Sequence, residues 1–199
     1  MVRKKLYYTP NSPYARVAHV AVRKSGLIDQ VEEIEAKTRD KATSYFDVTP
    51  LARVPVFIDG VVQLADTRDI CAYLDEITGN ARWFSKESHE ARYLRHITCG
   101  FLDGVAVWLR ENSRQEGHQS EPIMHYEEHR ALYTLKWLER HWKPVENMDF
   151  TALVLACAIQ ISIDRGLGGD WQKLAPKCTA WALRKTNDPD MLDTKPLPL

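Results

Sequence analysis

The feature that most constrains this chain is a short segment that predicts a tight β-hairpin entered through proline. Two strand-forming runs, Val54 to Ile58 and Val61 to Leu64, flank Asp59-Gly60, the dipeptide that two-residue hairpin loops favour. Pro55 stands near the start of the first run, a position that edge strands tolerate. If the Val54-Pro55 bond is cis, the N–H and C=O of Val54 turn outward and can pair with an extended peptide. We therefore expect a sheet edge that receives an extended peptide.

A βαβ unit precedes the hairpin. Leu6 to Tyr8 and Val31 to Ala36 predict strands. Between them, apolar residues recur at helical spacing from Tyr14 to Ala21, and Gly26 supplies the stop. The polar connection from Lys37 to Thr49 has room for a short helix.

Helical patterns dominate the rest of the chain. A helix from about Ile70 to Ile77, closed by Gly79, follows the hairpin. Four longer helical stretches come next, at about Ser88 to Asn112, Glu121 to Trp142, Phe150 to Arg165 and Asp170 to Thr186.

The boundary between the two patterns lies at residues 79–82. We expect an α/β domain over residues 1–80 and an all-helical domain over residues 86–199, which ends in an extended tail from Thr194 to Leu199.

Composition narrows the class of protein. Lysine plus arginine and aspartate plus glutamate number 27 each, so the chain carries no basic footprint for nucleic acid. The apolar run Leu6 to Tyr8 is too short for a signal peptide or a membrane span, and we expect a cytoplasmic protein. The cysteines form no CxxC pair and lie in apolar helical patterns, which fits a reduced compartment: Cys71, Cys99, Cys157 and Cys178.

Ser12-Pro13 opens the first predicted helix, with serine at the N-cap and proline at the first helical position. Most such pairs are only caps. A helix start also favours an anion such as a thiolate. Lowering a thiol pKa by two units needs about 2.7 kcal/mol. A hydroxyl hydrogen bond to a charged acceptor supplies ~1.5–3 kcal/mol and the helix end ~0.3–1, so Ser12 and its helix suffice.

Asp66 and Thr67 stand at the start of the next predicted helix, where they serve as caps. The same position binds a carboxylate through free N–H groups and a hydroxyl, while Asp66 can pair with an ammonium. Together the two residues suit the charged end group of an amino acid.

Two other motifs point to different chemistry, and we assign neither a function. His125 and His129 fit the HxxEH pattern of an inverted zinc protease, but the surrounding residues describe a solvated helix and no third ligand is evident. The glycines from Gly166 to Gly169 follow a helix rather than a strand, so we interpret them as a helix stop and turn. We expect no metal.

Taken together, these residues resemble the glutathione transferase superfamily over essentially the whole chain, and most closely its small bacterial members with a serine at the first helix. Three segments carry the resemblance: residues 12–16 (Ser-Pro-Tyr-Ala-Arg), residues 49–55 (Thr-Pro-Leu-Ala-Arg-Val-Pro), and residues 59–74 from Asp59-Gly60 to Leu74. The middle segment is the most specific. The resemblance implies a thioredoxin-like N-terminal domain, a helical C-terminal domain, and a homodimer with glutathione bound beside Ser12.

The chain departs from the family pattern at several positions. Thr49, Ala52 and Arg53 replace the usual Asn, Gly and Lys; Arg53 keeps a cation, whereas Ala52 limits backbone freedom. Thr67 replaces the usual serine and keeps its hydroxyl. At the start of the third long helix, Ala152 cannot complete the capping box that Asp149 begins.

The resemblance also implies roles for individual residues. Val54, beside Pro55, pairs with the cysteinyl backbone of glutathione, Asp66 and Thr67 hold the γ-glutamyl end, and Arg53 meets the glycyl end. The candidates for the wall of the second-substrate site are Tyr8, Tyr14 and Trp108.

The thiol contact has alternatives, because Tyr7, Tyr8 and Asn11 lie close to Ser12 in sequence and some relatives use tyrosine or asparagine. Asp103 matches an acidic residue that, in some relatives, reaches the glutathione amine of the neighbouring subunit.

The resemblance implies a detoxification enzyme that uses glutathione as a co-substrate and adds its thiol to a small hydrophobic electrophile, without nucleic acid or membrane as a partner. The alternative from another class is a non-catalytic interaction protein that keeps the fold, which fold alone does not exclude.

Overall fold

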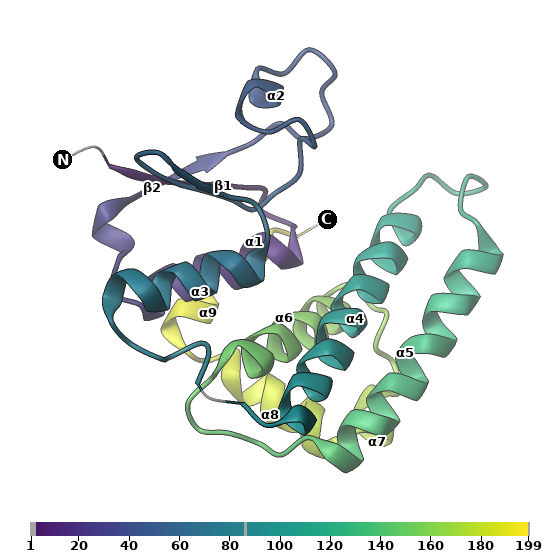
Figure 1. Cartoon of the computed structure of the whole chain (residues 1–199). Helices are drawn as coiled ribbons and strands as arrows, with labels where there is room; N and C mark the ends of the chain where they lie inside the picture. The colour runs from purple at the N-terminus through teal and green to yellow at the C-terminus, as the bar shows by residue number, and fades with distance from the viewer. Residues whose placement is uncertain (1–2, 86, 199) are drawn as a thin grey trace. The chain divides into compact units, whose positions relative to one another are not determined.

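A computed structural model describes residues 3–85 and 87–198 of the 199-residue chain. The chain divides into two compact units. The first comprises residues up to Ser85 together with those from Pro189 onward, and the second comprises the residues between them. An α/β first unit and a helical second unit confirm the fold class that the sequence predicts (Figure 1).

A four-stranded mixed sheet forms the centre of the first unit, in the order β2-β1-β3-β4. Its strands are β1 (Lys4–Tyr8), β2 (Val31–Glu35), β3 (Val56–Asp59) and β4 (Val62–Leu64). β1 runs parallel to β2 and antiparallel to β3, and Leu6 at its middle is fully buried. The predicted hairpin is confirmed: β3 and β4 pair across Asp59 and Gly60, and Gly60 adopts φ +59°, which glycine permits.

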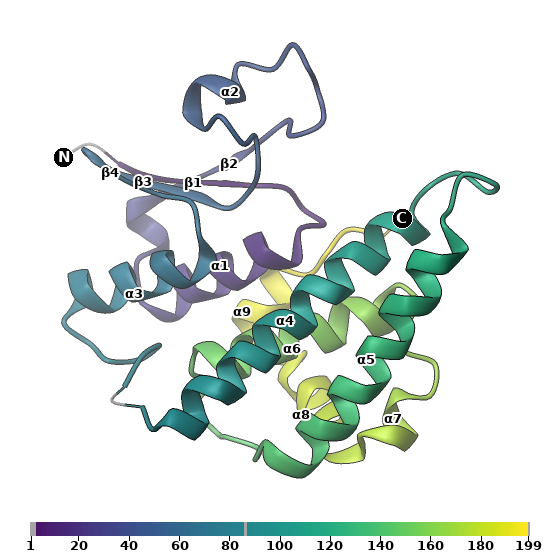
Figure 2. The same ribbon diagram turned by 45° about the vertical axis from the view of Figure 1, so that its right-hand side comes forward.

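Helices cover both faces of this sheet. The helical elements of the first unit are α1 (Pro13–Lys24), a 3₁₀ turn (Ile28–Gln30), α2 (Tyr45–Val48), α3 (Thr67–Thr78) and α9 (Pro189–Asp193). α1 and α3 lie side by side on one face, and α2 lies on the other (Figure 2). On the α2 side, Tyr45 packs with Ala52 and Val56 in a small apolar cluster that Tyr7 adjoins.

The described residues of the second unit form the helices α4 (His89–Asn112), α5 (Glu121–His141), α6 (Phe150–Asp164), α7 (Trp171–Leu174) and α8 (Pro176–Lys185). α6 is the core, since every residue from Phe150 to Ser162 is buried. Asp149 caps it by accepting a hydrogen bond from the Ala152 N–H at 2.8 Å, as expected. Among the described residues, none of the helices combines the length and apolar character that crossing a bilayer requires.

The predicted single helix from Asp170 to Thr186 is wrong. α7 ends at Leu174 and α8 begins at Pro176, with Ala175 between them at φ −139° and ψ 63°. Proline has no N–H to continue a helix and pushes the preceding residue out of helical geometry, so the helix breaks at Ala175.

The last described residues return to the first unit. α9 packs against α1, and Lys24 Nζ lies 3.0 Å from Asp190 Oδ2. α9 begins at Pro189, in a stretch for which we predicted no helix. Residues 195–198 belong to no helix or strand, and Leu199, the last residue of the predicted extended tail, lies outside the described residues. The assignment of residues 86–199 to one folding domain stays a prediction, because α9 contacts the first unit within the structure.

Asp75 on α3 holds the end of the first unit in place. Its carboxylate accepts hydrogen bonds from three consecutive backbone N–H groups, those of Arg82, Trp83 and Phe84, at 2.8–3.1 Å. The Trp83 side chain is buried, and its indole N–H donates to Ser25 Oγ at 3.1 Å. The Asp75 carboxylate therefore fixes the backbone of residues 82–84, which follow α3.

We expect Asp75→Asn to lower the free energy of unfolding by about 1.5–3 kcal/mol, because an amide removes the charge from these hydrogen bonds and brings an N–H toward other N–H groups. Urea unfolding followed by circular dichroism measures the change as a lower midpoint. The matched control is Glu76→Gln on the exposed neighbour, which should stay within about 0.5 kcal/mol of the wild type. Equal midpoints for the two variants would contradict this role.

Candidate functional site

The start of α1 is built around Ser12. Its backbone is extended, at φ −82° and ψ 117°, and its Oγ accepts a hydrogen bond from the Ala15 N–H at 3.1 Å. Pro13 occupies the first helical position, as expected from the sequence. Ser12 is half-buried, so its hydroxyl hydrogen can still turn toward a ligand while the oxygen caps the helix.

The start of α3 lies against the start of α1. Asp66 caps α3 by accepting from the Arg68 N–H at 2.8 Å, and its side chain is exposed. Thr67 is buried, and its hydroxyl donates to the Tyr14 carbonyl oxygen over a long 3.4 Å. Because Tyr14 is two residues from Ser12, this contact brings the two helix starts together.

The loop before β3 carries Arg53, Val54 and Pro55. The Val54-Pro55 bond is cis. Arg53 has an exposed side chain, and its carbonyl oxygen accepts a hydrogen bond from the Tyr45 hydroxyl at 2.9 Å. Burial, and the neighbouring Tyr7, raise the pKa of Tyr45 to about 12, so this hydroxyl keeps its proton and stays a donor.

Sheet register places this loop beside the end of β1. Tyr7 pairs with Val56 in the β1–β3 ladder, so the next residues outward are Tyr8 and Pro55. Val54 lies beyond the paired part of the strand. Ser12 follows from Tyr8 through a turn in which its N–H donates to the Thr9 carbonyl at 3.1 Å. The cis-proline loop and both helix starts therefore meet at one end of the sheet.

The two tyrosines of β1 point to opposite faces. The Tyr7 ring lies 5.4 Å from that of Tyr45 on the α2 side, and the Tyr8 ring lies 4.3 Å from that of His19 on the α1 side. Burial raises the pKa of Tyr8, with Glu35 and Glu33 adding to the effect. Tyr8 therefore remains a neutral phenol.

The remaining predicted residues differ in exposure. Tyr14 is half-buried near the start of α1, and Asn11 is exposed in the turn before it. Trp108 belongs to the second unit, where it lies on α4 with only 5% of its surface exposed. Asp103, on the same helix, is exposed. Trp108 is thus a core side chain of its own unit, and its role in substrate binding stays a prediction.

The motifs set aside from the sequence have structural explanations. The His129 ring packs 4.7 Å from that of Tyr133 along α5. Within residues 3–85 and 87–198, no group of three or more His, Cys, Asp or Glu side chains is arranged to hold a metal ion. Gly166 follows α6 with φ +73°, the left-handed conformation of a helix stop.

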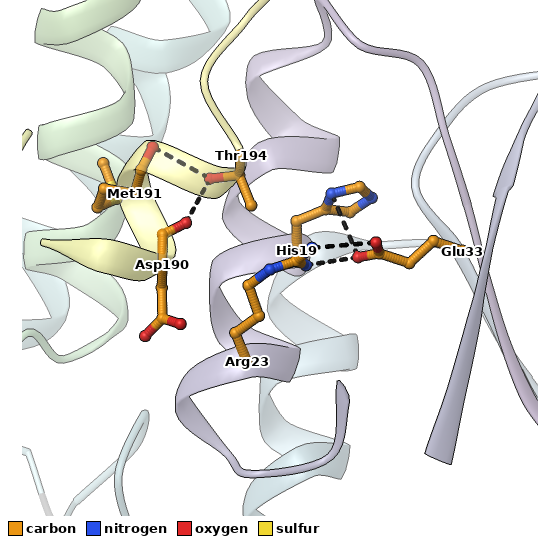
Figure 3. Close-up of polar contacts among 6 residues, drawn as sticks. All are labelled: His19, Arg23, Glu33, Asp190, Met191 and Thr194. Carbon is orange, nitrogen blue, oxygen red and sulfur yellow. Dashed lines mark hydrogen bonds and ion pairs between the residues drawn. The ribbon is translucent and has the colours of Figure 1, made fainter. Parts of the chain in front are cut away.

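A polar cluster on α1 was missed by sequence reasoning. Arg23 donates two hydrogen bonds to Glu33 of β2, at 2.5 and 3.0 Å, and His19 Nδ1 lies 3.5 Å from the same carboxylate (Figure 3). Arg16 and His19 are both buried. The signal was available: residues 16, 19 and 23 are polar at helical spacing within an otherwise apolar helix, which places them on one face.

Comparison with known proteins identifies a family for the first part of the chain. Residues 6–82 match the family described as glutathione S-transferase, N-terminal domain. This part of the chain is a glutathione S-transferase N-terminal domain. The matched range includes the starts of α1 and α3 and the cis-proline loop. No curated protein sequence matches the chain.

Solved glutathione transferase structures share the fold at low sequence identity. One from Pseudomonas fluorescens, with bound glutathione, has a TM-score of 0.84 and 22% identity over 98% of this chain and 99% of that chain. One from Methylobacillus flagellatus, with glutathione bound, has a TM-score of 0.83 and 22% identity over 98% and 100%. One from Methylobacterium radiotolerans, in complex with glutathione sulfonate, has a TM-score of 0.83 and 19% identity over 100% and 97%.

His19 makes stability depend on pH. Burial lowers its pKa to about 4, against the opposing effect of Glu33, whereas in the unfolded chain it titrates near 6.5. Between these values the unfolded chain takes up a proton that the folded chain does not, so stability is lost as pH falls. At about 1.4 kcal/mol per unit of pKa difference, we expect a loss of up to about 3 kcal/mol.

The variant His19→Gln should remove this part of the pH dependence, which urea unfolding at pH 7 and near pH 4 would measure in both proteins. Proton NMR of the folded wild type provides the direct check. A His19 pKa near its ordinary value would contradict the expectation.

Proposed function

We propose that this protein is a glutathione transferase that adds the thiol of glutathione to a small hydrophobic electrophile. The observation that carries the proposal is the meeting of the two helix starts, with Ser12 at one and Asp66 and Thr67 at the other, joined by the Thr67–Tyr14 hydrogen bond. Both starts present N–H groups to an anion, which suits a thiolate at the start of α1 and the γ-glutamyl carboxylate at the start of α3.

Ser12 is the proposed thiol contact. Its oxygen already accepts from Ala15, so its hydrogen is the group that remains to donate to sulfur. Donation to a thiolate favours the charged form and lowers the thiol pKa. The thiolate, rather than the thiol, is the nucleophile that attacks the electrophile. Tyr8 is a weaker candidate because its ring packs against His19 on the α1 side, with 4.3 Å between the ring centroids.

Asp66 and Thr67 are proposed to bind the γ-glutamyl end. The exposed Asp66 carboxylate can pair with the ammonium, while the first-turn N–H groups of α3 bind the carboxylate. The Thr67 hydroxyl donates to Tyr14 only over 3.4 Å, so a carboxylate is a better acceptor for it.

The remaining assignments complete the proposed site. Val54, outside the β1–β3 ladder and next to Pro55, pairs with the cysteinyl backbone, and the exposed Arg53 meets the glycyl carboxylate. Tyr8, Tyr14 and Trp108 remain the proposed wall for the electrophile. We also propose that the protein is a cytoplasmic homodimer active in detoxification, with no metal in its reaction.

Ser12→Ala should raise the pKa of the bound glutathione thiol by more than about one unit, since a hydrogen bond to a charged acceptor contributes ~1.5–3 kcal/mol and one unit is ~1.4. Affinity should change little, because the bond favours the ionised form. Titration of thiolate absorbance in the bound state measures the shift. Ser12→Thr, which keeps a hydroxyl, is the control, and an unchanged pKa in the alanine variant would move the role to Tyr8 or Asn11.

Asp66→Asn should weaken glutathione binding by roughly 10- to 150-fold, because asparagine still caps α3 but cannot neutralise the ammonium. The bound thiol pKa should stay nearly unchanged. Calorimetry measures the affinity, and Asp69→Asn is the matched control, since Asp69 is an exposed carboxylate in the same helical turn. Equal losses in both variants would indicate general electrostatics instead of a direct contact. Absence of glutathione binding by the wild type would favour the non-catalytic interaction protein.

A further inference from the structure

A pocket of about 260 Å³ lies within the first unit, between α1, the ends of β1 and β2, and the segment that follows α9, and it shares only Tyr8 with the proposed transferase site. Its lining includes Tyr8, Arg16 and His19 but none of Ser12, Asp66 and Thr67. The volume is below the range typical of drug-sized ligands, about 300–1,000 Å³, so a ligand here is small.

Arg16 brings an incompletely paired cation to this pocket. The side chain is 5% exposed, and its Nη2 donates to the Met191 carbonyl oxygen at 3.0 Å. Its Nε and Nη1 are enclosed and have no hydrogen-bond partner among the described residues. A buried guanidinium with free N–H groups is unfavourable unless an acceptor meets it, and a carboxylate is the acceptor it binds best.

His19 contributes an unpaired hydrogen-bond acceptor to the pocket. Its lowered pKa keeps the imidazole neutral at pH 7, so one ring nitrogen donates and the other accepts. The Glu33 carboxylate beside Nδ1 favours the proton on that nitrogen (Figure 3). Nε2 is then an acceptor, and it is buried with no partner among the described residues. It requires a donor.

Charges of both signs remain unpaired around the opening. Arg23 and Glu33 neutralise each other through two hydrogen bonds. Of the other charged residues that line the pocket, Asp193 interacts electrostatically with Arg23, whereas Lys195 and Glu35 form no ion pair in the part of the chain that the structure describes. A ligand with a single charge would pair with either the positive or the negative side chains of the pocket, but not with both.

We propose that this pocket binds a small α-amino acid as its zwitterion, with the carboxylate at Arg16 and the ammonium at His19 Nε2 and Glu35. Arg16 and His19 are three residues apart on one helix, where side chains are neighbours at about 5–6 Å between Cβ atoms. A carboxylate and an ammonium on the same carbon match that short separation. An apolar electrophile would leave both buried groups unpaired, and a single phosphate would face Glu35 and Asp193.

Entry of the ligand involves the end of the chain. α9 covers the guanidinium through Met191, and residues from Asp193 to Leu197 form one side of the pocket. The ligand reaches Nε and Nη1 when this segment shifts locally. Hydrogen exchange of the same segment should therefore change when the pocket fills.

The first test compares three probes by calorimetry on the full chain. Alanine should bind, while N-acetylalanine and alaninamide, each lacking one of the two charges, should bind about tenfold more weakly or worse, since each loses a charged hydrogen bond. Equal binding of all three, or no binding of alanine at tens of millimolar, would overturn the proposal.

The second test locates the site. Arg16→Met should abolish alanine binding, and the exposed Glu35→Gln, which cannot disturb the core, should weaken it by up to about fivefold. Glu32→Gln, on the same strand but outside the pocket, is the matched control and should change nothing. If Arg16→Met fails to fold, Glu35→Gln decides, and an affinity equal to that of Glu32→Gln overturns the proposal.

Alanine could instead bind at the proposed glutathione site, and the same kind of variant distinguishes the two sites. Asp66→Asn would then weaken alanine binding and Arg16→Met would not, and this pattern would overturn the amino-acid pocket. The reverse pattern supports it, whether or not the protein transfers glutathione.

Discussion

Burial of α1 is the constraint on which the first unit depends. Nine of its twelve residues, from Pro13 to Val22, are buried, because β1, α3 and α9 all pack against it. A helix enclosed in this way has little freedom to slide or rotate, since each side chain fits among close neighbours. Its N-terminus is therefore held rigidly beside the start of α3, where the proposed thiol contact requires a defined position.

The same enclosure makes the polar residues of α1 unusual. Most buried polar groups find partners within the protein, and Arg23 does so through Glu33. Arg16 and His19 do so only in part. An apolar pair at these positions would stabilise the unit without leaving unpaired groups, so the polar pair is explained better by a ligand than by stability. One rigid helix thus presents a proposed substrate contact at its end and a proposed ligand pocket along its side.

Much of the fold was predictable because local rules decide it. Asp59-Gly60 fixes a hairpin through its turn conformation, Gly79 ends α3 at φ +68°, and Asp149 caps α6. The proposed glutathione site was predictable for a related reason: Ser12, Pro55 and Asp66 lie in short motifs whose geometry is set by neighbours in sequence. Their roles toward glutathione remain proposals.

Most of what sequence reasoning missed depends on contacts between distant segments, and one miss is local. The break at Ala175 follows from Pro176, a local signal that the apolar pattern around it outweighed. α9 is too short to show a helical spacing of apolar residues. Its contacts are with Lys24 and Arg16, more than 160 positions earlier in the sequence. The partners of Arg16 and His19 likewise come from β2 and the end of the chain. No window of adjacent residues contains that information.

The placement of α9 also determines the order in which the protein can be completed during synthesis. The ribosome makes β1 to α3 first, but the residues from Pro189 that cover α1 emerge only after the whole second unit. Until then the Arg16 guanidinium lacks its contact with Met191, and Lys24 lacks Asp190. The nascent first unit is thus left with an uncovered flank of α1 until the second unit has been made. A chain truncated within the second unit would therefore keep Arg16 and Lys24 without these partners.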